Sequence, residues 1–132
     1  MYNETTLIGR LTREPEITIT TSNAKVAKLS IASSVNSKHG KYTVWFTVNV
    51  WAGAAEFAEK YLHTGDLVHI TGSLIPDFDT GNPPVFQKRN GEYASQYVLR
   101  GRVLTLLQRK RNVSIDEEDD IFMEKEFDDI AF

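Results

Sequence analysis

Apolar and polar residues alternate strictly along residues 42–51, which read YTVWFTVNVW. The even positions carry Tyr, Val, Phe, Val and Val, whereas the odd positions carry Thr, Trp, Thr, Asn and Trp. Because successive side chains of a strand point to opposite faces of a sheet, the even set predicts a core face and the odd set predicts a face toward water. The pattern therefore places two large indoles, Trp45 and Trp51, on the face where polar residues are expected.

Comparable patterns, separated by turn residues, predict a series of short strands elsewhere in the chain. The candidates are Thr5–Leu11, with Ile17–Thr21 as its continuation, then Val26–Val35, Lys41–Trp51, Leu67–Ile75 and Gln96–Leu107. The first strand stops near Glu14–Pro15, because proline cannot donate a backbone hydrogen bond and restricts the residue before it. Residues 36–40 (NSKHG) are typical of a turn, so the second and third strands are expected to form a hairpin.

Only one segment has helical character, Ala54–Leu62, which is rich in helix-forming residues and is followed by Gly65. The residues expected on one face of this helix are Phe57, Ala58, Tyr61 and Leu62. A long connection, residues 76–95, separates the last two strands, and connections of this length are often functional or disordered. Five strands with one short helix between the third and the fourth predict an all-β fold, the five-stranded oligonucleotide/oligosaccharide-binding (OB) barrel.

The composition is that of one globular domain. The chain has 132 residues, of which 41% are hydrophobic and 25% charged, and none of its apolar runs approaches the roughly 20 residues of a membrane span. It contains no cysteine, which excludes disulfides and zinc–thiolate sites. The first residues, MYNETTLIGR, lack the basic start and apolar block of a secretory signal, so we expect a cytoplasmic protein.

Charge is distributed unevenly along the chain. Residues 1–112 carry 14 basic and 9 acidic side chains, a net charge of +5, whereas residues 113–132 carry 1 and 9, a net charge of −8. We therefore predict two parts, a binding domain over residues 1–112 and a disordered acidic tail over residues 113–132. A basic body attracts a polyanion and leaves the tail for another partner. The alternative is that the tail only keeps the protein soluble.

Three hypotheses compete for Trp45 and Trp51: a second layer of core, a subunit interface, or platforms on which unpaired bases stack. Thr47 and Asn49 lie between them, which argues against a dry layer. Bases stack on aromatic rings with about 1 to 3 kcal/mol each, while Lys and Arg neutralise phosphates. The candidate nucleic-acid contacts on other predicted strands and loops are Arg10, Lys28, Phe78, Phe86, Lys88, Arg89, Arg100 and Arg102.

Catalysis is not favoured by any pattern in the chain. The three histidines, His39, His63 and His69, lack the spacing of metal ligands, and a glycine-rich phosphate loop is absent. The close acidic pairs all fall in the tail, which cannot hold a reactive geometry. We therefore predict that the protein is not an enzyme and uses no metal or cofactor.

Four segments resemble the bacterial and phage single-stranded DNA-binding protein family. Residues 7–16 (LIGRLTREPE) resemble its opening L-x-G-x-L-x-x-D-P-E, with Glu14 in place of aspartate, and residues 26–34 (VAKLSIASS) resemble its second strand. Residues 44–74 carry the most specific match, because Trp45, Val48 and Trp51 fit the family pattern W-x-x-V-x-x-(F/W), which an A-E pair follows. Where the family has lysine and glycine after this pair, the chain has Thr64-Gly65. Residues 128–132 (DDIAF) resemble the family's D-D-(I/L)-P-F tip, with Ala131 in place of proline.

The resemblance implies a protein that coats and protects single-stranded DNA as a homotetramer and acts in DNA replication, recombination and repair. Trp45 and Trp51 fall on two positions whose aromatic residues stack DNA bases in the family. A third such position falls near Ser37, which cannot stack, and Phe78 lies one place from a fourth. The tip that would recruit partner enzymes is Asp128, Asp129, Ile130, Ala131 and Phe132. The short spacer before this tip suggests a phage-encoded member. An OB-fold protein-interaction adaptor and an RNA-binding OB module are the alternatives that we keep.

Overall fold

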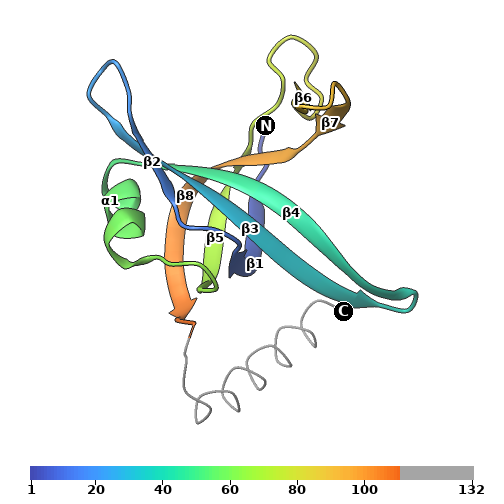
Figure 1. Cartoon of the computed structure of the whole chain (residues 1–132), viewed down its shortest axis with the longest axis horizontal. Helices are drawn as coiled ribbons and strands as arrows, with labels where there is room; N and C mark the ends of the chain where they lie inside the picture. The colour runs from blue at the N-terminus through green and yellow to red at the C-terminus, as the bar shows by residue number, and fades with distance from the viewer. Residues whose placement is uncertain (111–132) are drawn as a thin grey trace.

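Residues 1–110, the part of the chain that the computed structural model describes, consist mostly of β-strands (Figure 1). The elements in chain order are β1 (Thr5–Leu11), β2 (Glu16–Ile19), β3 (Lys25–Ser37), β4 (Gly40–Trp51), α1 (Ala52–Tyr61), β5 (Leu67–Leu74), β6 (Val85–Gln87), β7 (Tyr93–Ser95) and β8 (Tyr97–Gln108). The predicted strands and the single predicted helix are all present, with boundaries that differ by a few residues. The predicted boundary at residue 112 and the acidic tail lie outside the described residues.

Five of these strands close into a barrel. The large sheet runs β1-β5-β8-β4-β3-β2, and β1 also pairs with β3, through Arg10 opposite Ala32 and Leu11 opposite Ile31. The β4–β8 pairing is parallel, and the other pairings are antiparallel. The helix α1 connects β4 to β5, the third and fourth strands of the barrel. The prediction of an all-β OB barrel is confirmed.

The strand β2 forms an antiparallel hairpin with the first residues of β3. It pairs from Glu16 opposite Lys28 to Ile19 opposite Lys25, and Asn23 in the turn adopts a φ of 65°. Asparagine tolerates this left-handed region better than most residues. Since β1 and β2 both pair with β3 at successive positions, the predicted continuation of the first strand is correct apart from the break around Pro15.

The β3–β4 hairpin extends beyond the barrel as an arm. Its ladder continues to Ser37 opposite Gly40, whereas β8 pairs with β4 only from Phe46 to Asn49. Figure 1 shows the two strands projecting past the other strands of the barrel. Along the arm, β4 therefore has an edge beside residues 42–45 that no other strand of the described part of the chain pairs with.

The connection over residues 76–95 contains a small hairpin, β6–β7, that the sequence analysis did not predict. Val85 lies opposite Ser95, and Gln87 lies opposite Tyr93. The turn contains Asn90-Gly91, with Gly91 at a φ of 89° and its amide donating to the Lys88 carbonyl at 3.0 Å. An Asn-Gly pair between short apolar runs is a hairpin signal, so this element was visible in the sequence.

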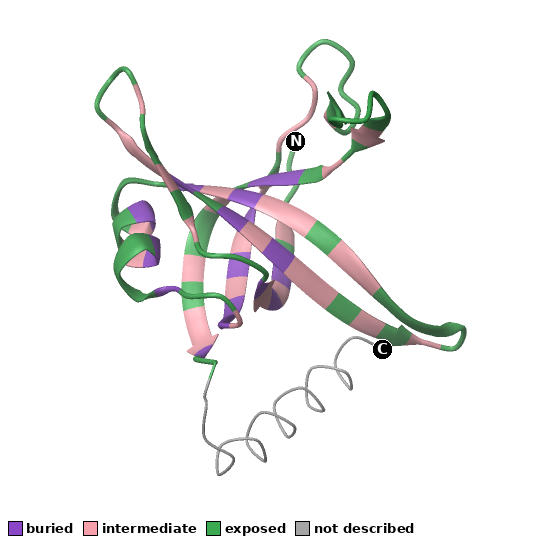
Figure 2. Cartoon of the chain, viewed as in Figure 1, coloured by how far each residue is buried: buried purple, intermediate pink, exposed green. Residues whose placement is uncertain are grey.

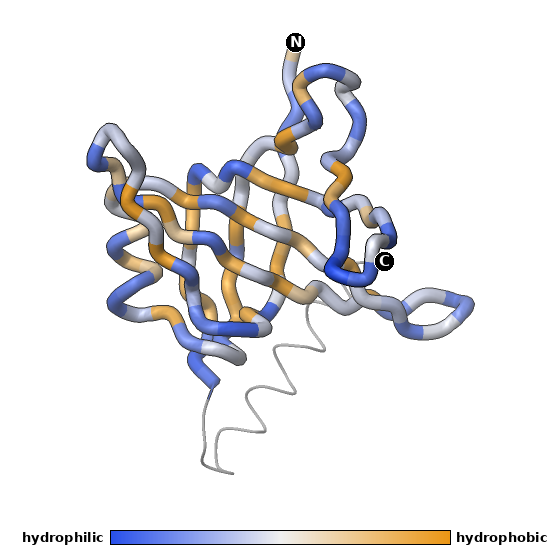
Figure 3. Tube along the Cα trace, turned by 45° about the horizontal axis from the view of Figure 1, so that its top comes forward, coloured by the Kyte–Doolittle hydropathy of each residue, from blue (hydrophilic) through white to orange (hydrophobic). Residues whose placement is uncertain are grey.

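The core follows the alternation read from β4. Val48 and Val50 are fully buried, whereas Trp45 is 63% and Trp51 39% exposed, and Figure 2 shows the same alternation of buried and less buried residues along the strands. Figure 3 shows the matching alternation of apolar and polar residues, with hydrophilic residues gathered in the loops. Burial of the even residues decreases along the arm, since Val44 and Phe46 are partly buried and Tyr42 is 52% exposed. The hypothesis that the tryptophans form a second core layer is wrong within the described chain.

The described residues contain no helix that is both long and apolar enough to cross a membrane.

Gly9 in β1 permits the close approach of β1 and β3 that closes the barrel. A Cβ at this position would lie 2.6 Å from the Ala32 carbonyl oxygen and 2.6 Å from Cγ2 of Ile31. We expect Gly9→Ala to lower the free energy of unfolding by about 1 to 3 kcal/mol, the usual effect of overpacking. Urea unfolding followed by circular dichroism measures this change. Gly53→Ala in α1 is the control, because a Cβ there has open space. An equal loss in both variants would contradict the steric explanation.

Glu14, in the link between β1 and β2, forms hydrogen bonds with the loop that follows α1. Its Oε1 accepts hydrogen bonds from the Thr64 amide at 3.2 Å and the Thr64 hydroxyl at 3.3 Å, and its Oε2 lies 3.2 Å from Nδ1 of His63. The Thr64 amide first, and then His63, hold the pKa of Glu14 below its ordinary value of 4.5. The folded state therefore favours the charged carboxylate.

A depressed pKa in the folded state contributes stability above the unfolded pKa, and this stability disappears as the pH falls through the folded pKa. We expect Glu14→Gln to be less stable than the parent at neutral pH, and the difference to shrink progressively as the pH falls below 4.5. Thermal melts across this range measure the difference. Glu56→Gln, at an exposed position on α1, is the control. A difference that does not change with pH would contradict the assignment.

Candidate nucleic-acid interface

Both tryptophans lie on the outer face of the β3–β4 pair. In the antiparallel register Trp51 lies opposite Val26 and Trp45 opposite Ala32. The pairs between them are polar, Lys28 opposite Asn49 and Ser30 opposite Thr47. Residues directly opposite each other in such a ladder share one face of the sheet. The result is a strip with an aromatic ring at each end and hydrogen-bonding groups between the rings.

Arg100 extends this strip onto β8. The parallel register places it beside Asn49, and its guanidinium carbon lies 5.5 Å from the centroid of the Trp51 ring. A cation at this distance over an indole is attracted by the negative face of the ring. The contact orients Trp51 while leaving it 39% exposed, so this end of the strip offers an aromatic surface and a positive charge together.

A groove of about 770 Å³ crosses the other end of the strip, at Trp45. Thr12 and Arg13, in the link between β1 and β2, line it on one flank of the β3–β4 pair. Phe86 of β6 and Tyr97 of β8 line it on the other flank. The groove is open to solvent, and Trp45 lies between the residues that line its two flanks.

Tyr97 is an aromatic residue of the groove that the sequence analysis did not select. It is the first residue of β8 and is 53% exposed, and its ring lies 5.8 Å from that of Phe46 at an interplanar angle of 41°. The sequence feature that could have identified Tyr97 is its position, since it is an aromatic residue directly after the long connection. Its neighbour Phe46 could not be identified, because the parallel register of β4 and β8 joins segments about fifty residues apart. Tyr42 and Arg13 also line the groove and were not among the predicted site residues.

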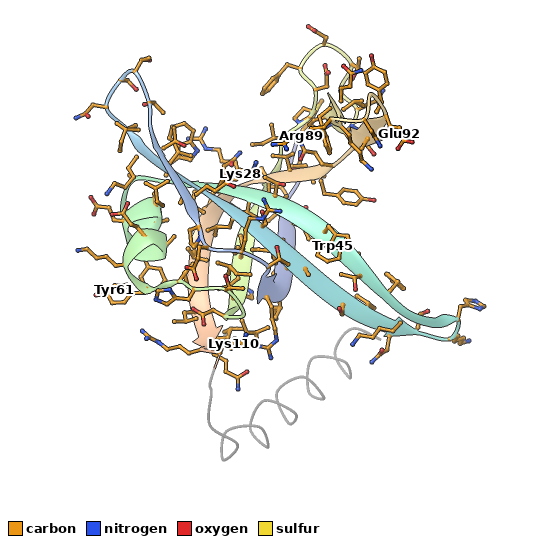
Figure 4. The ribbon with its side chains drawn as sticks, in the orientation of Figure 1. Lys28, Trp45, Tyr61, Arg89, Glu92 and Lys110 are labelled. Carbon is orange, nitrogen blue, oxygen red and sulfur yellow. The ribbon has the colours of Figure 1, made fainter. Side chains whose placement is uncertain are left out.

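Several predicted cations lie on or near this surface. Lys28 is on the strip, where its Nζ lies 4.0 Å from the Glu16 carboxylate, with both side chains about half exposed. An exposed pair of this kind contributes little stability, so a phosphate can replace the carboxylate. Lys88 and Arg89 are exposed in the turn of the β6–β7 hairpin. Figure 4 shows Lys28 and Trp45 on the β3–β4 side and Arg89 on the small hairpin.

The structure places three other predicted residues away from the groove. The Arg10 guanidinium donates to the Gly65 carbonyl at 3.0 Å, and Arg102 forms an ion pair with Glu4 near the N-terminus. Phe78 is 88% exposed in the loop before β6 and does not line the groove. Contacts of Arg10, Arg102 and Phe78 with nucleic acid therefore stay predictions.

The remaining predicted site residues, 128–132, lie outside the described residues. Among residues 1–110, no group of three or more His, Asp or Glu side chains is arranged to hold a metal ion.

Comparison with known proteins gives a consistent result. A model of the single-strand binding protein family matches residues 2–77. A single-stranded DNA-binding protein 1 from a Nostoc species is 33% identical over 110 residues, which are 83% of this chain and 87% of the relative. The Wolinella succinogenes single-stranded DNA-binding protein is 29% identical over 83% of this chain and 67% of its own length. The one from Malacoplasma penetrans is 38% identical over 55% of this chain, a match that spans only 38% of that relative.

Proposed function

The chain belongs to the single-strand binding protein family, and we propose that it coats and protects single-stranded DNA. The bases stack on Trp45 and Trp51, and the neighbouring cations neutralise phosphates. As a member of this family the chain is a binding protein and not an enzyme. A role in DNA replication, recombination and repair is part of this proposal, and assembly into a tetramer and a phage origin stay predictions.

One observation carries the proposal, the exposure of two tryptophans on a polar strip. Burying a Trp side chain away from water is favourable by a few kcal/mol, so two indoles held in solvent at the ends of one strip point to a ligand that covers them. A base covers an indole without requiring a particular sequence, because every base has a π-face. Asn49, Thr47 and Ser30 between the rings suit a hydrated, polar ligand better than an apolar protein surface.

We expect Trp45→Ala and Trp51→Ala each to weaken binding of oligo-dT by about 1 to 3 kcal/mol, with a similar loss for other sequences, because a stacking surface is removed and no base edge was read. Fluorescence anisotropy with labelled oligonucleotides measures the affinity. Tyr61→Ala is the control, since Tyr61 is 47% exposed but lies on α1. Unchanged affinity together with a changed mass in solution would instead support the hypothesis of a subunit interface.

Repeating these titrations at several salt concentrations separates the proposal from the alternatives. Binding to DNA releases condensed counterions, so the affinity should fall steeply as salt rises. An adaptor that docks proteins through apolar contacts should show a weak dependence. Competition between deoxy and ribo oligonucleotides of one sequence tests the RNA-binding alternative, since a ribose-reading protein prefers the 2′-hydroxyl.

We further propose that the acidic segment recruits partner enzymes of replication, recombination or repair. Asp128 and Asp129 followed by Ile130 and Phe132 combine two charges with two apolar side chains, which suits an apolar pocket rimmed by Arg or Lys. The +5 body does not need these apolar side chains to bind DNA. The segment can therefore serve a second partner while the strip is occupied.

We expect deletion of residues 130–132 to abolish capture of a DNA helicase or recombination mediator while leaving oligo-dT affinity within about twofold of the parent, since no acidic side chain is removed. Deletion of residues 113–132 removes a net charge of −8 and should tighten DNA binding, mainly at low salt, where screening is weak. Pull-downs and anisotropy provide the two measurements. Equal capture by the parent and by the shorter deletion would refute recruitment through this tip.

A further inference from the structure

We propose that Tyr97 is a further base-stacking residue, so that DNA leaving Trp45 passes the free edge of β4 and continues toward the β6–β7 hairpin. This inference rests on the proposed function, because it extends the path of the same ligand. It adds a residue on another strand, at the far flank of the groove.

The position of Tyr97 is set by the end of the β4–β8 pairing. The first matched pair is Phe46 with Tyr97, and within residues 1–110 no strand pairs with this edge of β4 beside residues 42–45. Tyr97 therefore stands at the point where the edge of β4 becomes free. Trp45, the residue before Phe46, lines the same groove. The register places Tyr97 on the face of Phe46, opposite to the outer face that carries Trp45. A chain that crosses the outer face at Trp45 therefore meets Tyr97 after it turns around the free edge of β4.

The ring of Tyr97 is supported but not covered. Phe46 contacts it in a tilted arrangement, with the centroids 5.8 Å apart, and the side chain stays 53% exposed. Tyr97 also lines a small hollow of about 150 Å³, together with Pro76, Pro83 and Pro84 of the loop before β6. Supported, half-exposed rings suit base stacking, because their orientation is fixed before the base arrives.

Charge and neighbouring aromatics favour this flank of the groove. Phe86 lines the groove beside Tyr97 and is 42% exposed. Lys88 and Arg89 follow it in the hairpin turn, with Glu92 as the acidic side chain of that turn. The turn thus has a net positive charge close to two exposed rings, the combination that phosphates and bases require.

Tyr61 provides a matched comparison within the same chain. It is 47% exposed and its ring lies 5.2 Å from that of Phe57 at 42°, nearly the same environment as the Tyr97–Phe46 pair. Tyr61 ends α1, and Figure 4 shows it on the opposite side of the molecule from Arg89. It also lines neither the groove nor the small hollow. Exposure and ring contact are therefore similar in the two tyrosines, whereas Tyr97 lines the groove and Tyr61 does not.

The test uses single-tryptophan variants of the full chain. In a Trp45→Phe, Trp51→Phe background, Tyr97→Trp places the only fluorophore of this kind at the proposed site, and Tyr61→Trp places it on α1. Saturating oligo-dT should quench the emission of the first variant and leave the second unchanged. The Trp51→Phe variant, which keeps Trp45, reports on the proposed function itself.

Affinity gives a second readout. We expect Tyr97→Ala to weaken oligo-dT binding by about 5-fold or more, the lower end of the effect of removing a stacking ring, and Tyr97→Phe to bind within about 2-fold of the parent. Tyr61→Ala should bind as the parent does. Thermal melts establish that each variant is folded, and Tyr97→Phe keeps the contact with Phe46 if the alanine variant is unstable.

The outcomes separate the two levels of the proposal. Quenching at Trp45 without quenching at position 97, together with full affinity of Tyr97→Ala, would overturn the role of Tyr97 and leave the proposed function in place. Absence of quenching at both positions would refute the proposed function. Equal quenching at positions 61 and 97 would also overturn the role of Tyr97, because it would show a general effect of DNA on the emission.

Discussion

Closure of the barrel between β1 and β3 is the constraint on which the candidate site depends. Only two residue pairs join these strands, and Gly9 allows the approach because no side chain lies between its Cα and the backbone of β3. Once the barrel is closed, its interior is filled by fully buried side chains such as Leu29, Val48 and Val50. The period of two along β4 then leaves Trp45 and Trp51 no place inside. The exposure of the tryptophans is thus a consequence of filling the core with the residues between them.

Strand alternation within one segment carried most of the sequence-based prediction. The faces of β4 and the order of strands and helix along the chain follow from local patterns, and the structure confirms them. What local patterns cannot predict is which distant segments become neighbours. The contact of Arg100 with Trp51 and that of Tyr97 with Phe46 both arise from the parallel pairing of β4 with β8. Tyr97 was missed for this reason, although its residue type suits the site.

Cations were harder to assign than aromatics for a related physical reason. A long charged side chain on an outward position finds whichever acceptor is near, and single-sequence patterns contain no information about that acceptor. Arg10 donates to the Gly65 carbonyl and Arg102 pairs with Glu4, so groups of the described chain itself engage both cations. Lys28 remains on the strip beside Asn49. For Trp45 and Trp51, in contrast, the alternation along β4 predicts the outer face, and both rings are exposed there.

The balance between stacking and charge follows from these pairings. Lys28 and Arg13 both lie near Glu16, at 4.0 and 3.8 Å, so one carboxylate partly neutralises two cations at the edge of the strip. Phosphates must compete with that carboxylate, which lowers the electrostatic gain from each contact. The aromatic rings stay accessible, because Trp45 is 63% exposed and Trp51 is 39% exposed although the Arg100 guanidinium carbon lies 5.5 Å from its centroid. On this surface the rings should therefore supply the salt-independent part of the affinity, and the cations should mainly determine how DNA approaches and how strongly salt opposes it.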